Sequence, residues 1–457
     1  MKLRFLNRKD EKRRLRRATA IKGGALAVVY GRRRCGKSRL LQHVVSDHDI
    51  YYLADQKESV LQIRDFAVEI DRIVPGFSSA SYAGWDVLFS TLNDRLDRLA
   101  CIHLDEFPYL VQASSELPSQ IQKFLDLPGP KRLNIVICGS SQRMMHGLVM
   151  DRAAPLYGRA VEIIKVEPLK PGWIRNGLGL HGQDAVDAYS VWGGVPRYWE
   201  LSALADTQGE AVREHVFERN GVLHNEPMRL LLDDMRSAVQ PYSLLYLIGQ
   251  GCHRLSELAA RLGKPATSLQ RPLVQLVDLG YVRRDTPFGE DAKKSRKTVY
   301  RICDPFLLFY FRFLEPNKSQ LEIGRVSPVL SKVRRHLEQH VSIVWEDLAR
   351  ASVPFSGIGR HDWGVARRWW GSGVDGQPME VDVVAESEDG KALLIGEVKW
   401  RAKRSGLRGL QDRFKMVEEN LPFVKGRKIV RAVWSKRDWS QREIHVMFPE
   451  ATLDCLM

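Results

Sequence analysis

The sequence predicts an α/β fold made of several domains, the first of them built on a parallel sheet. Three observations lead to this prediction. Short apolar runs alternate with helical stretches in the first third of the chain, as in a parallel sheet that helices cover on both faces. One of these runs leads directly into a glycine-rich turn. The chain has 457 residues, more than one hydrophobic core usually holds, so we expect roughly two to four domains.

Five apolar runs are the expected strands of the first domain. Each has the length and composition of a buried strand and follows a helical stretch. They are Leu26–Tyr30, Ile50–Leu53, Ala100–Leu104, Leu133–Cys138 and Val161–Val166. Because the carboxyl ends of parallel strands meet along one edge of a sheet, we expect the residues that follow these runs to share a crevice.

The turn after the first strand fills every fixed position of the pattern GxxxxGK[ST]. Its glycines, Gly31 and Gly36, let backbone N–H groups turn toward a polyphosphate. Lys37 can neutralise the phosphate oxygens, and Ser38 can ligate Mg²⁺. The strand before this loop and the helix after it are the context that the pattern needs. We therefore expect the chain to bind a nucleoside triphosphate together with Mg²⁺.

The third strand ends in two carboxylates, in the form of a Walker B element. Asp105 is expected to hold the hydrated Mg²⁺ ion as part of the nucleotide site. Glu106 is expected to orient and deprotonate the attacking water. An apolar run followed by Asp-Glu is a weak signal alone, but the phosphate-binding loop earlier in the chain strengthens it. Together the two motifs indicate hydrolysis.

Two further positions complete the expected catalytic site. Either Ser140 or Ser141, at the end of the fourth strand, is expected to sense the γ-phosphate, with Ser141 as the catalytic candidate. A serine at a strand end is also an ordinary turn residue. Arg159 precedes the fifth strand and is expected either to supply positive charge to the transition state, in cis or to a neighbouring subunit, or to be a surface arginine.

Charge and cysteine usage restrict the class of protein. The net charge of +15 and a pI near 9.5 suit a polyanionic partner such as DNA or RNA, although a basic soluble protein is the alternative. Six cysteines are scattered without a CxxC pair, as in a cytosolic protein with reduced thiols. The most apolar stretch, Phe306–Leu314, is too short to span a bilayer. We expect a cytoplasmic protein without a membrane partner.

Residues 236–315 have the pattern of a winged helix. Two helices with apolar positions at helical spacing are expected to flank a turn at Gly263–Pro265. The buried positions are Leu255, Leu258, Ala259 and Leu262 in the first helix and Leu269, Leu273, Leu276 and Leu279 in the second. Ser256 is the expected cap of the first helix. Pro272 is unfavourable in the second, since a proline inside a helix costs roughly 3 kcal/mol.

A basic wing is expected after these helices. Two strand-like segments flank the loop Lys293–Lys297, whose cationic side chains suit phosphate contacts. The second helix would present polar side chains to DNA, namely Thr267, Ser268, Gln270, Arg271 and Gln275. Many winged helices bind protein or serve only as structural modules, so both interpretations stay open.

The last segment carries a second group of charged residues. The runs Glu380–Glu386 and Lys391–Trp400 are expected to form a hairpin, with a two-residue turn at Glu388–Asp389 or Asp389–Gly390. Both registers keep the same side chains on one face. These side chains are Glu380, Asp382, Glu397 and Lys399.

This charged face predicts metal chemistry. Asp382 and Glu397 can bind Mg²⁺, and Lys399 can position or activate a water for attack on a phosphodiester. The alternative is the charged outer face of a half-exposed sheet.

Several motifs, in this order, resemble those of the archaeal-type ATPase family, which consists of AAA+/STAND-related P-loop ATPases. They are Gly31–Ser38, Leu104–Pro108, Cys138–Ser141, Pro155–Arg159 and Trp192–Pro196. The resemblance implies ATP as the nucleotide and a helical lid over it. It also implies that the opening segment Phe5–Glu11 helps to contact the base.

The hairpin resembles the D…ExK signature of the PD-(D/E)xK nuclease superfamily. It also resembles the uncharacterised C-terminal domain that is often fused to such ATPases. Glu346, in an expected helix Val341–Arg350, fits the accessory acidic position of the nucleases. This resemblance implies a restriction-endonuclease-like α/β domain, which can retain its scaffold after losing activity.

The sequence thus predicts a Mg²⁺-dependent ATPase whose nucleotide state controls DNA engagement, with or without metal-dependent cleavage. The alternative is an ATP-switched regulator or protein-assembly platform with an inactive nuclease-like domain. ATP and DNA are the expected partners, and a homo-oligomer is a further option. The expected parts are the ATPase domain 1–170, lid 171–235, winged helix 236–315, linker 316–335 and nuclease-like domain 336–457.

Overall fold

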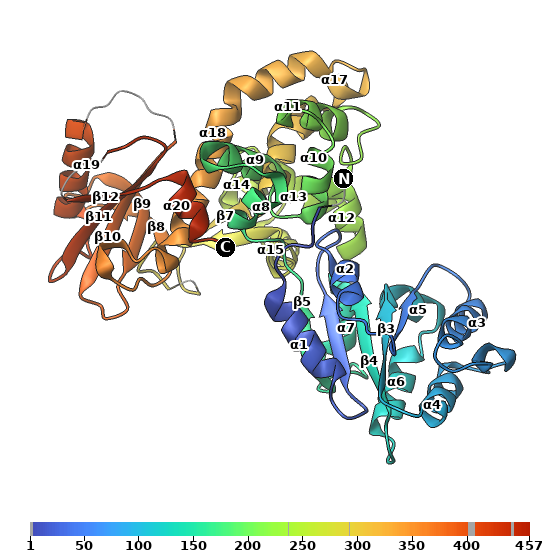
Figure 1. Ribbon diagram of the computed structural model, residues 1–457. Coiled ribbons are helices and arrows are strands. Elements are labelled where there is room, and N and C mark those ends of the chain that lie inside the picture. Colours follow the sequence, from blue (N-terminus) through green and yellow to red (C-terminus); the bar gives the residue numbers. More distant parts are fainter. Residues whose placement is uncertain (1–2, 236, 292, 401–406, 440–442) are drawn as a thin grey trace. The chain divides into compact units, whose positions relative to one another are not determined.

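The computed structural model describes residues 3–235, 237–291, 293–400, 407–439 and 443–457 (Figure 1). The chain divides into two compact units. The amino-terminal unit comprises Phe5–Pro168 and Arg229–Arg236, and the carboxyl-terminal unit mainly comprises Leu169–Met228 and Ser237–Met457. Among the described helices, none combines the length and hydrophobicity that crossing a membrane requires.

A parallel sheet forms the centre of the amino-terminal unit. Its strands lie in the order β2-β3-β4-β1-β5, and their pairings are all parallel. The strands are β1 (Leu26–Tyr30), β2 (Ile50–Leu53), β3 (Ala100–Asp105), β4 (Leu133–Gly139) and β5 (Ala160–Lys165). These bounds confirm the predicted strands to within one residue at each end. Both β3 and β4 are buried along their whole length, which explains their mainly apolar sequences.

Helices cover this sheet and hold its strands in place. They are α1 (Lys9–Thr19), α2 (Lys37–Gln42), α3 (Ser59–Ile70), α4 (Trp85–Arg95), α5 (Phe107–Ala113), α6 (Leu117–Asp126) and α7 (Gln142–Val149). The sheet face that carries Leu26, Val28 and Ile135 shares a core with α3, α4 and α6, where Trp85 and Phe89 are fully buried. The loops at the carboxyl ends of the strands therefore start from a rigid base.

The carboxyl-terminal unit begins with short helices. They are α8 (Ile174–Leu178), α9 (Gly182–Trp192), α10 (Pro196–Ser202) and α11 (Gln208–Val212). The chain passes from one unit to the other within α12 (Glu226–Asp234). The predicted helical character of residues 171–235 agrees with these elements, and its role as a lid stays a prediction.

A winged-helix order of elements follows. It consists of α13 (Val239–Gly249), α14 (Leu255–Leu262), α15 (Ala266–Asp278), β6 (Val282–Asp285) and β7 (Val299–Ile302), with β6 and β7 antiparallel. The predicted cap at Ser256 is wrong, because α14 begins at Leu255 and Arg254 is its cap residue. The Glu257 carboxylate accepts hydrogen bonds from the N–H groups of His253 and Arg254, at 2.9 and 3.0 Å. Pro272 lies inside α15, and the helix continues through it.

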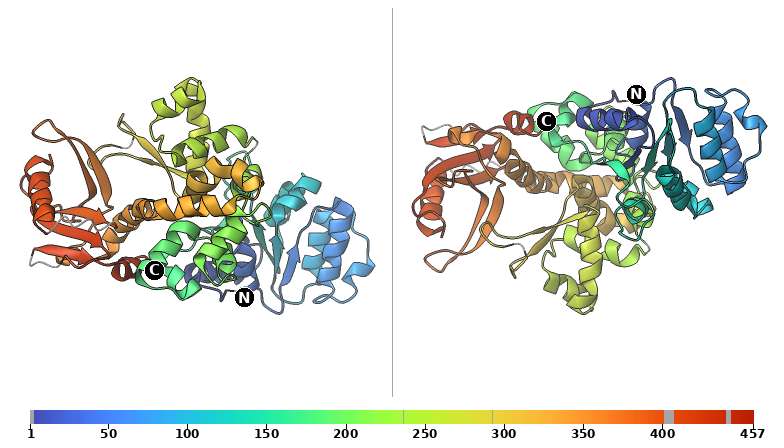
Figure 2. Two further views of the ribbon diagram at one scale, coloured as in Figure 1. Left: turned by 90° about the horizontal axis from the view of Figure 1, so that it is seen from above. Right: turned by 90° about the horizontal axis from the view of Figure 1, so that it is seen from below.

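Residues 316–335, expected as a linker, are mainly helical. After α16 (Pro305–Phe309) come α17 (Lys318–Glu322) and then α18 (Val326–Ser352), which contains the expected helix 341–350. Buried valines at positions 326, 329 and 333 give the first turns of α18 an apolar face. This long helix, orange in Figure 2, runs from the helical part of the unit to the carboxyl-terminal sheet.

A mixed sheet forms the end of the chain. It has the order β12-β11-β10-β9-β8, with antiparallel pairing from β8 to β10 and parallel pairing from β10 to β12. The elements are β8 (Arg367–Ser372), β9 (Pro378–Glu386), β10 (Ala392–Lys399), α19 (Leu407–Asn420), β11 (Lys428–Ser435), β12 (Ile444–Met447) and α20 (Pro449–Asp454). Leu393 pairs with Glu386, so the hairpin is centred on Asp389–Gly390, one of the two predicted registers.

Candidate functional sites

The loop between β1 and α2 has the backbone geometry of a phosphate cradle. Gly31 has φ +142° and Gly36 has φ +91°, values that favour glycine. A Cβ atom on Gly31 would lie 2.4 Å from the carbonyl oxygen of Val166, so a larger residue does not fit. Beside Gly36, a Cβ atom would meet no atom of the described residues within 4 Å. The space there is open to a ligand.

Lys37 reaches back across this loop. Its side chain is buried, and its Nζ donates hydrogen bonds to the carbonyl oxygens of Gly31 (2.9 Å) and Arg32 (3.1 Å). The ammonium group is therefore held inside the turn that is expected to surround the phosphates. Ser38 is the next residue of α2 and is half-buried at the start of this helix. The donor set fits a Mg²⁺-bound nucleoside triphosphate, since it offers a cation, a hydroxyl and free loop space.

Asp105 and Glu106 lie at the carboxyl edge of the same sheet. Asp105 is fully buried, and its carboxylate accepts hydrogen bonds from the Tyr51 hydroxyl (2.7 Å) and the Glu106 N–H (3.0 Å). Burial and the nearby Asp105 carboxylate raise the pKa of Tyr51, so Tyr51 stays protonated as a donor. Glu106 adopts a left-handed backbone conformation, with φ +54°, at the turn into α5. Tyr51 could not be predicted from the sequence, because its contact with Asp105 depends on the pairing of β2 with β3.

The structure separates the two serines that the sequence left as alternatives. Ser140 donates a hydrogen bond to the Glu106 carboxylate at 2.9 Å. Ser141 caps α7, where its hydroxyl accepts from the Met144 N–H at 3.4 Å, and it donates to the carbonyl oxygen of Asp233 at 3.0 Å. The contacts therefore favour Ser140 over Ser141 as the residue that acts with Glu106.

Arg159 lies at the opposite edge of the sheet. Its neighbour Ala160 pairs with Leu26, at the start of β1, whereas the phosphate-binding loop follows the end of β1. The Arg159 guanidinium forms an ion pair with Asp126 at 2.7 Å on the surface. A role in cis is therefore wrong, because the amino ends of parallel strands point away from the crevice. A role toward a neighbouring subunit stays a prediction.

The opening segment is attached to the phosphate-binding loop. Arg8 is buried and donates to the carbonyl oxygens of Cys35 (3.2 Å) and Glu167. The ring of Phe5 lies 4.1 Å from the ring of His43, measured between centroids. These contacts place the segment beside the nucleotide loop, as the predicted role in contacting the base requires.

The predicted carboxylates of the second site come together on β9 and β10. Asp382 accepts a hydrogen bond from the Val398 N–H at 2.9 Å, and Glu397 is almost fully buried. Burial, and then the charges of Glu397 and Glu346, raise the pKa of Asp382. Glu346 of α18 is thus close enough to act on Asp382 electrostatically. Glu380, by contrast, pairs with Arg368.

Cations compensate Glu397 in this cluster. Lys399 Nζ lies 2.7 Å from one of its carboxylate oxygens, and Arg413 Nε lies 2.9 Å from the other. Within the described part of the chain, no group of three or more His, Cys, Asp or Glu side chains is arranged to hold a metal. Asp382 and Glu397 still fit Mg²⁺, which is commonly bound through one or two carboxylates plus substrate phosphates. Arg413 was not predicted, because its contact depends on how α19 crosses β10.

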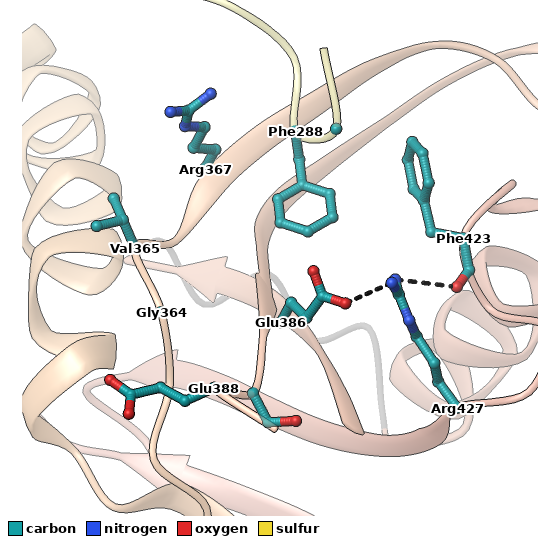
Figure 3. Close-up of a pocket in the computed structure, with 10 residues that line it drawn as sticks. Phe288, Gly364, Val365, Arg367, Glu386, Glu388, Phe423 and Arg427 are labelled. Atoms are coloured by element: carbon teal, nitrogen blue, oxygen red, sulfur yellow. Dashed lines mark hydrogen bonds and ion pairs between the residues drawn. The ribbon is translucent and has the colours of Figure 1, made fainter. Parts of the chain in front are cut away.

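The wing packs against this sheet. Phe288, in the loop between β6 and β7, lies edge to face with Phe423 at 5.6 Å, and its N–H donates to the carbonyl oxygen of Arg368 at 2.9 Å. A cavity of about 490 Å³ lies beside them (Figure 3). The Arg427 guanidinium reaches Glu386 and the carbonyl oxygen of Phe423 in its wall. The winged helix and the carboxyl-terminal sheet therefore share walls of the same cavity.

The predicted DNA-contacting residues are accessible. All the polar residues expected on the second helix are exposed on α15, and the predicted cations of the wing loop are exposed as well. Lys297 forms an ion pair with Glu290 at 2.9 Å. The remaining cations of this loop are Lys293, Lys294 and Arg296.

The parallel sheet, the glycine-rich loop after β1 and the carboxylates at the end of β3 define the class of P-loop nucleotide-binding proteins. Comparison with protein families agrees with this class. Residues 5–201 match an ATPase domain found predominantly in Archaea, and residues 247–286 match the IclR helix-turn-helix domain. The match of the amino-terminal part to an ATPase domain supports ATP binding and hydrolysis.

Residues 310–410 match a family of archaeal and bacterial proteins of unknown function. This match gives no support to the predicted nuclease-like identity. Over 411 residues the chain is 27% identical to an uncharacterized protein of Methanocaldococcus jannaschii, covering 87% of this chain and 88% of that protein. The solved structure of a Walker-type ATPase of Pyrococcus abyssi has a TM-score of 0.51 at 19% identity, covering 67% of this chain and 96% of that one. This likeness shows the fold.

Proposed function

We propose that this protein is a Mg²⁺-dependent ATPase whose nucleotide state controls its engagement of DNA. The observation that carries the proposal is the meeting of Lys37, Asp105 and Glu106 at one edge of the parallel sheet. Mg²⁺, when bound with ATP, supplies charge compensation for the phosphates. Ser38 and Asp105 are the residues that would hold it.

Three residues of the chain bind the phosphates, activate the water and orient the general base. Lys37 exchanges its hydrogen bonds to the loop carbonyls for phosphate oxygens. Glu106 orients a water molecule and accepts its proton, which requires a free carboxylate oxygen. The Ser140 hydroxyl donates a hydrogen bond of 2.9 Å to one oxygen of this carboxylate, and this bond orients the Glu106 side chain.

We propose DNA as the polyanion that the winged helix binds. The exposed polar face of α15, the exposed cations of the wing loop and the helix-turn-helix match support this assignment. The charge of +15 supports it too, because each phosphate contact releases condensed counterions from DNA.

Metal-dependent cleavage by the carboxyl-terminal sheet is part of the proposal. Asp382 and Glu397 would hold Mg²⁺, and Lys399 would position the attacking water. One observation favours the alternative of an inactive domain in an ATP-switched regulator or assembly platform. Both carboxylate oxygens of Glu397 already have cationic partners, Lys399 and Arg413.

Plasmid nicking separates these two functions. Supercoiled plasmid is incubated with the full-length protein and Mg²⁺ or Mn²⁺, with and without ATP. We expect nicks with the wild type and none with Asp382→Ala, whereas Glu388→Ala, an exposed carboxylate in the same hairpin, serves as the matched control. Nicks that persist in Asp382→Ala come from another source and contradict the cleavage assignment. If the wild type binds DNA without cutting it, the regulator is the better account.

A further inference from the structure

A cavity of about 350 Å³ lies where the wing strands, α18 and β8 meet in the carboxyl-terminal unit. Among the described residues that line it, six are arginines: Arg283, Arg284, Arg301, Arg350, Arg367 and Arg368. The acidic residues in the lining are Asp285 and Asp347. The wall of the cavity therefore carries an excess of positive charge.

The two aspartates are already neutralised. Asp347 forms ion pairs with Arg283 and Arg350, both at 2.6 Å. Burial alone would raise the pKa of Asp347, yet these guanidinium groups lower it to about 2, so Asp347 is ionised at neutral pH. The Asp285 carboxylate lies 3.1 Å from Nε of Arg283 and 3.9 Å from Nε of Arg301. Neither carboxylate is left to balance the other arginines.

Each of three remaining arginines, Arg284, Arg367 and Arg368, has either a guanidinium charge without an ion pair or an N–H group without a hydrogen-bond acceptor among the described residues. Arg284 and Arg367 are exposed, and they form no ion pair with the part of the chain that the structure describes. Arg368 pairs with Glu380, but its Nε is buried and lacks a hydrogen-bond partner among the described residues. Burial, followed by repulsion from Arg301, lowers the pKa of Arg368. An anion in the cavity would compensate both the buried N–H and the repelled charge.

The cavity lies directly beside the carboxylate cluster. Arg350 donates to the carbonyl oxygen of Asp382 at 2.9 Å and lies 3.7 Å from the Glu346 carboxylate. On the other side, the N–H of Phe288 in the wing is bonded to Arg368 of β8. Arg350 therefore touches the predicted metal-binding hairpin, and Arg368 touches the wing through its carbonyl oxygen and Glu380 of the hairpin through its guanidinium group.

We propose that this arginine-lined cavity binds a backbone phosphate of DNA, so that the wing and the carboxyl-terminal sheet form one continuous DNA-binding surface. The planar guanidinium group matches phosphate with two parallel hydrogen bonds, which makes arginine the preferred residue for such contacts. A phosphate held there would bring the neighbouring phosphodiester bond to Asp382 and Glu397. The proposal rests on the proposed function in taking DNA as the partner.

Binding of a labelled DNA duplex to the full-length protein tests this proposal. Fluorescence anisotropy is measured in EDTA without nucleotide, over a range of NaCl concentrations. The variant is Arg284→Ala/Arg367→Ala, which removes two exposed arginines that hold no ion pair within the described residues. The control is Arg334→Ala/Arg335→Ala, with the same charge change at exposed positions of α18, about 18 Å or more along the helix from Asp347.

We expect the variant to bind DNA at least about tenfold more weakly than the control. The magnitude of its slope of log K against log salt should fall by about 0.9, because the variant loses the one phosphate contact that the cavity makes. Thermal melting of both variants checks that they fold equally. If the variant and the control have the same affinity and salt slope, the cavity does not contact DNA and the proposal is overturned.

Inorganic phosphate distinguishes DNA from a small anion. If phosphate stabilises the wild type but not the variant, while DNA binding is the same in both, the cavity takes a small anion and the proposal is wrong. The nicking assay stays separate from this test. If the variant binds DNA more weakly and the wild type leaves the plasmid uncut, the nuclease is rejected and the cavity is retained. If the wild type nicks the plasmid and the variant binds and nicks as the wild type does, the cavity is rejected and the nuclease is retained.

Discussion

Ser140 and Ser141 are adjacent in the chain, but they have different neighbours. Ser140 touches the predicted general base Glu106, whereas Ser141 caps α7 and bonds to the carbonyl oxygen of Asp233. Catalysis and stability should therefore respond differently to the two serines.

Exchanging each serine for alanine tests this difference. Ser140→Ala should slow ATP turnover by about tenfold, since it leaves Glu106 without its positioning hydrogen bond. Ser141→Ala should leave turnover near that of the wild type and lower stability by about 1 kcal/mol, because a helix cap is lost. Steady-state hydrolysis and thermal melting of the two variants provide the measurements. The assignment is reversed if Ser141→Ala is the one that loses turnover.

Glu106 has a stricter prediction. Glu106→Gln keeps the shape of the side chain but removes the base, so hydrolysis should slow by roughly a hundredfold or more. ATP binding should persist, since Lys37 and the loop are unchanged. Equilibrium binding of a fluorescent ATP analogue, measured beside single-turnover hydrolysis, separates the two effects. Turnover at the wild-type rate would remove Glu106 from the mechanism.

Single site residues could be predicted only from local motifs, and their roles stay predictions. The loop glycines, Lys37, Asp105 and Glu106 were predicted because each role follows from a short pattern after a strand. The choice between Ser140 and Ser141 needed the position at which α7 begins. For Arg159, the sequence contained an argument against the predicted role in cis. A residue that precedes a strand of a parallel sheet lies at the edge away from the ligand.

Among the elements, α18 is held by a buried histidine. His340 Nε2 lies 2.7 Å from the carbonyl oxygen of Ser190, and its ring packs against Phe309 and Phe313. Burial lowers the pKa of His340 from 6.5 to about 4, so the folded protein keeps this imidazole neutral. The unfolded chain gains a proton below pH 6.5, whereas the folded chain does not.

Acid should therefore destabilise the carboxyl-terminal unit through His340. The stability that the neutral His340 side chain contributes is complete above pH 6.5. It is lost as the pH falls toward about 4, and the total loss is roughly 3 kcal/mol. His340→Gln cannot titrate and should flatten the decrease in melting temperature over this range. His336→Gln, an exposed histidine on the same helix, is the control. Equal pH dependence in the two variants would exclude this role of His340.

The wing loop has its own prediction. Replacing its cations Lys293, Lys294, Arg296 and Lys297 by alanine should weaken DNA binding and reduce the salt slope, because fewer phosphates are contacted. The loop is exposed, so melting temperature should change little. Anisotropy titrations at several salt concentrations measure the slope. If it is unchanged, the loop does not contact phosphate.

Element boundaries were predictable where apolar runs were continuous, as in β1 and β2. The expected linker failed for a physical reason. Residues 316–335 were expected as a linker, but Val326, Val329 and Val333 recur at helical spacing and are buried in α18. That spacing was the signal for α18 in the sequence.

For the whole molecule, long-range packing is what the sequence could not reveal. The winged helix and the carboxyl-terminal sheet were expected as separate domains, yet they belong to one compact unit and meet through Phe288, Phe423 and Arg368. No local pattern encodes such a contact. The charged hairpin was predicted in one of two registers, but its compensation by Arg413 was not.

Divalent metal should stabilise the protein through this hairpin. Asp382 and Glu397 repel each other when both are ionised, and a shared Mn²⁺ ion would relieve this repulsion. In the full-length protein without nucleotide, Mn²⁺ should raise the melting temperature of the wild type more than that of Asp382→Asn. Glu388→Gln should behave as the wild type. Equal stabilisation of wild type and Asp382→Asn would exclude a shared metal site.

The most direct test of the central claim is the steady-state rate of ATP hydrolysis by the full-length protein, measured with and without duplex DNA. The account predicts Mg²⁺-dependent turnover that changes when DNA is added and that disappears in Lys37→Ala, which lacks the ammonium group held inside the phosphate loop. Turnover that survives in Lys37→Ala, or an absence of turnover in the wild type under all these conditions, would contradict the claim.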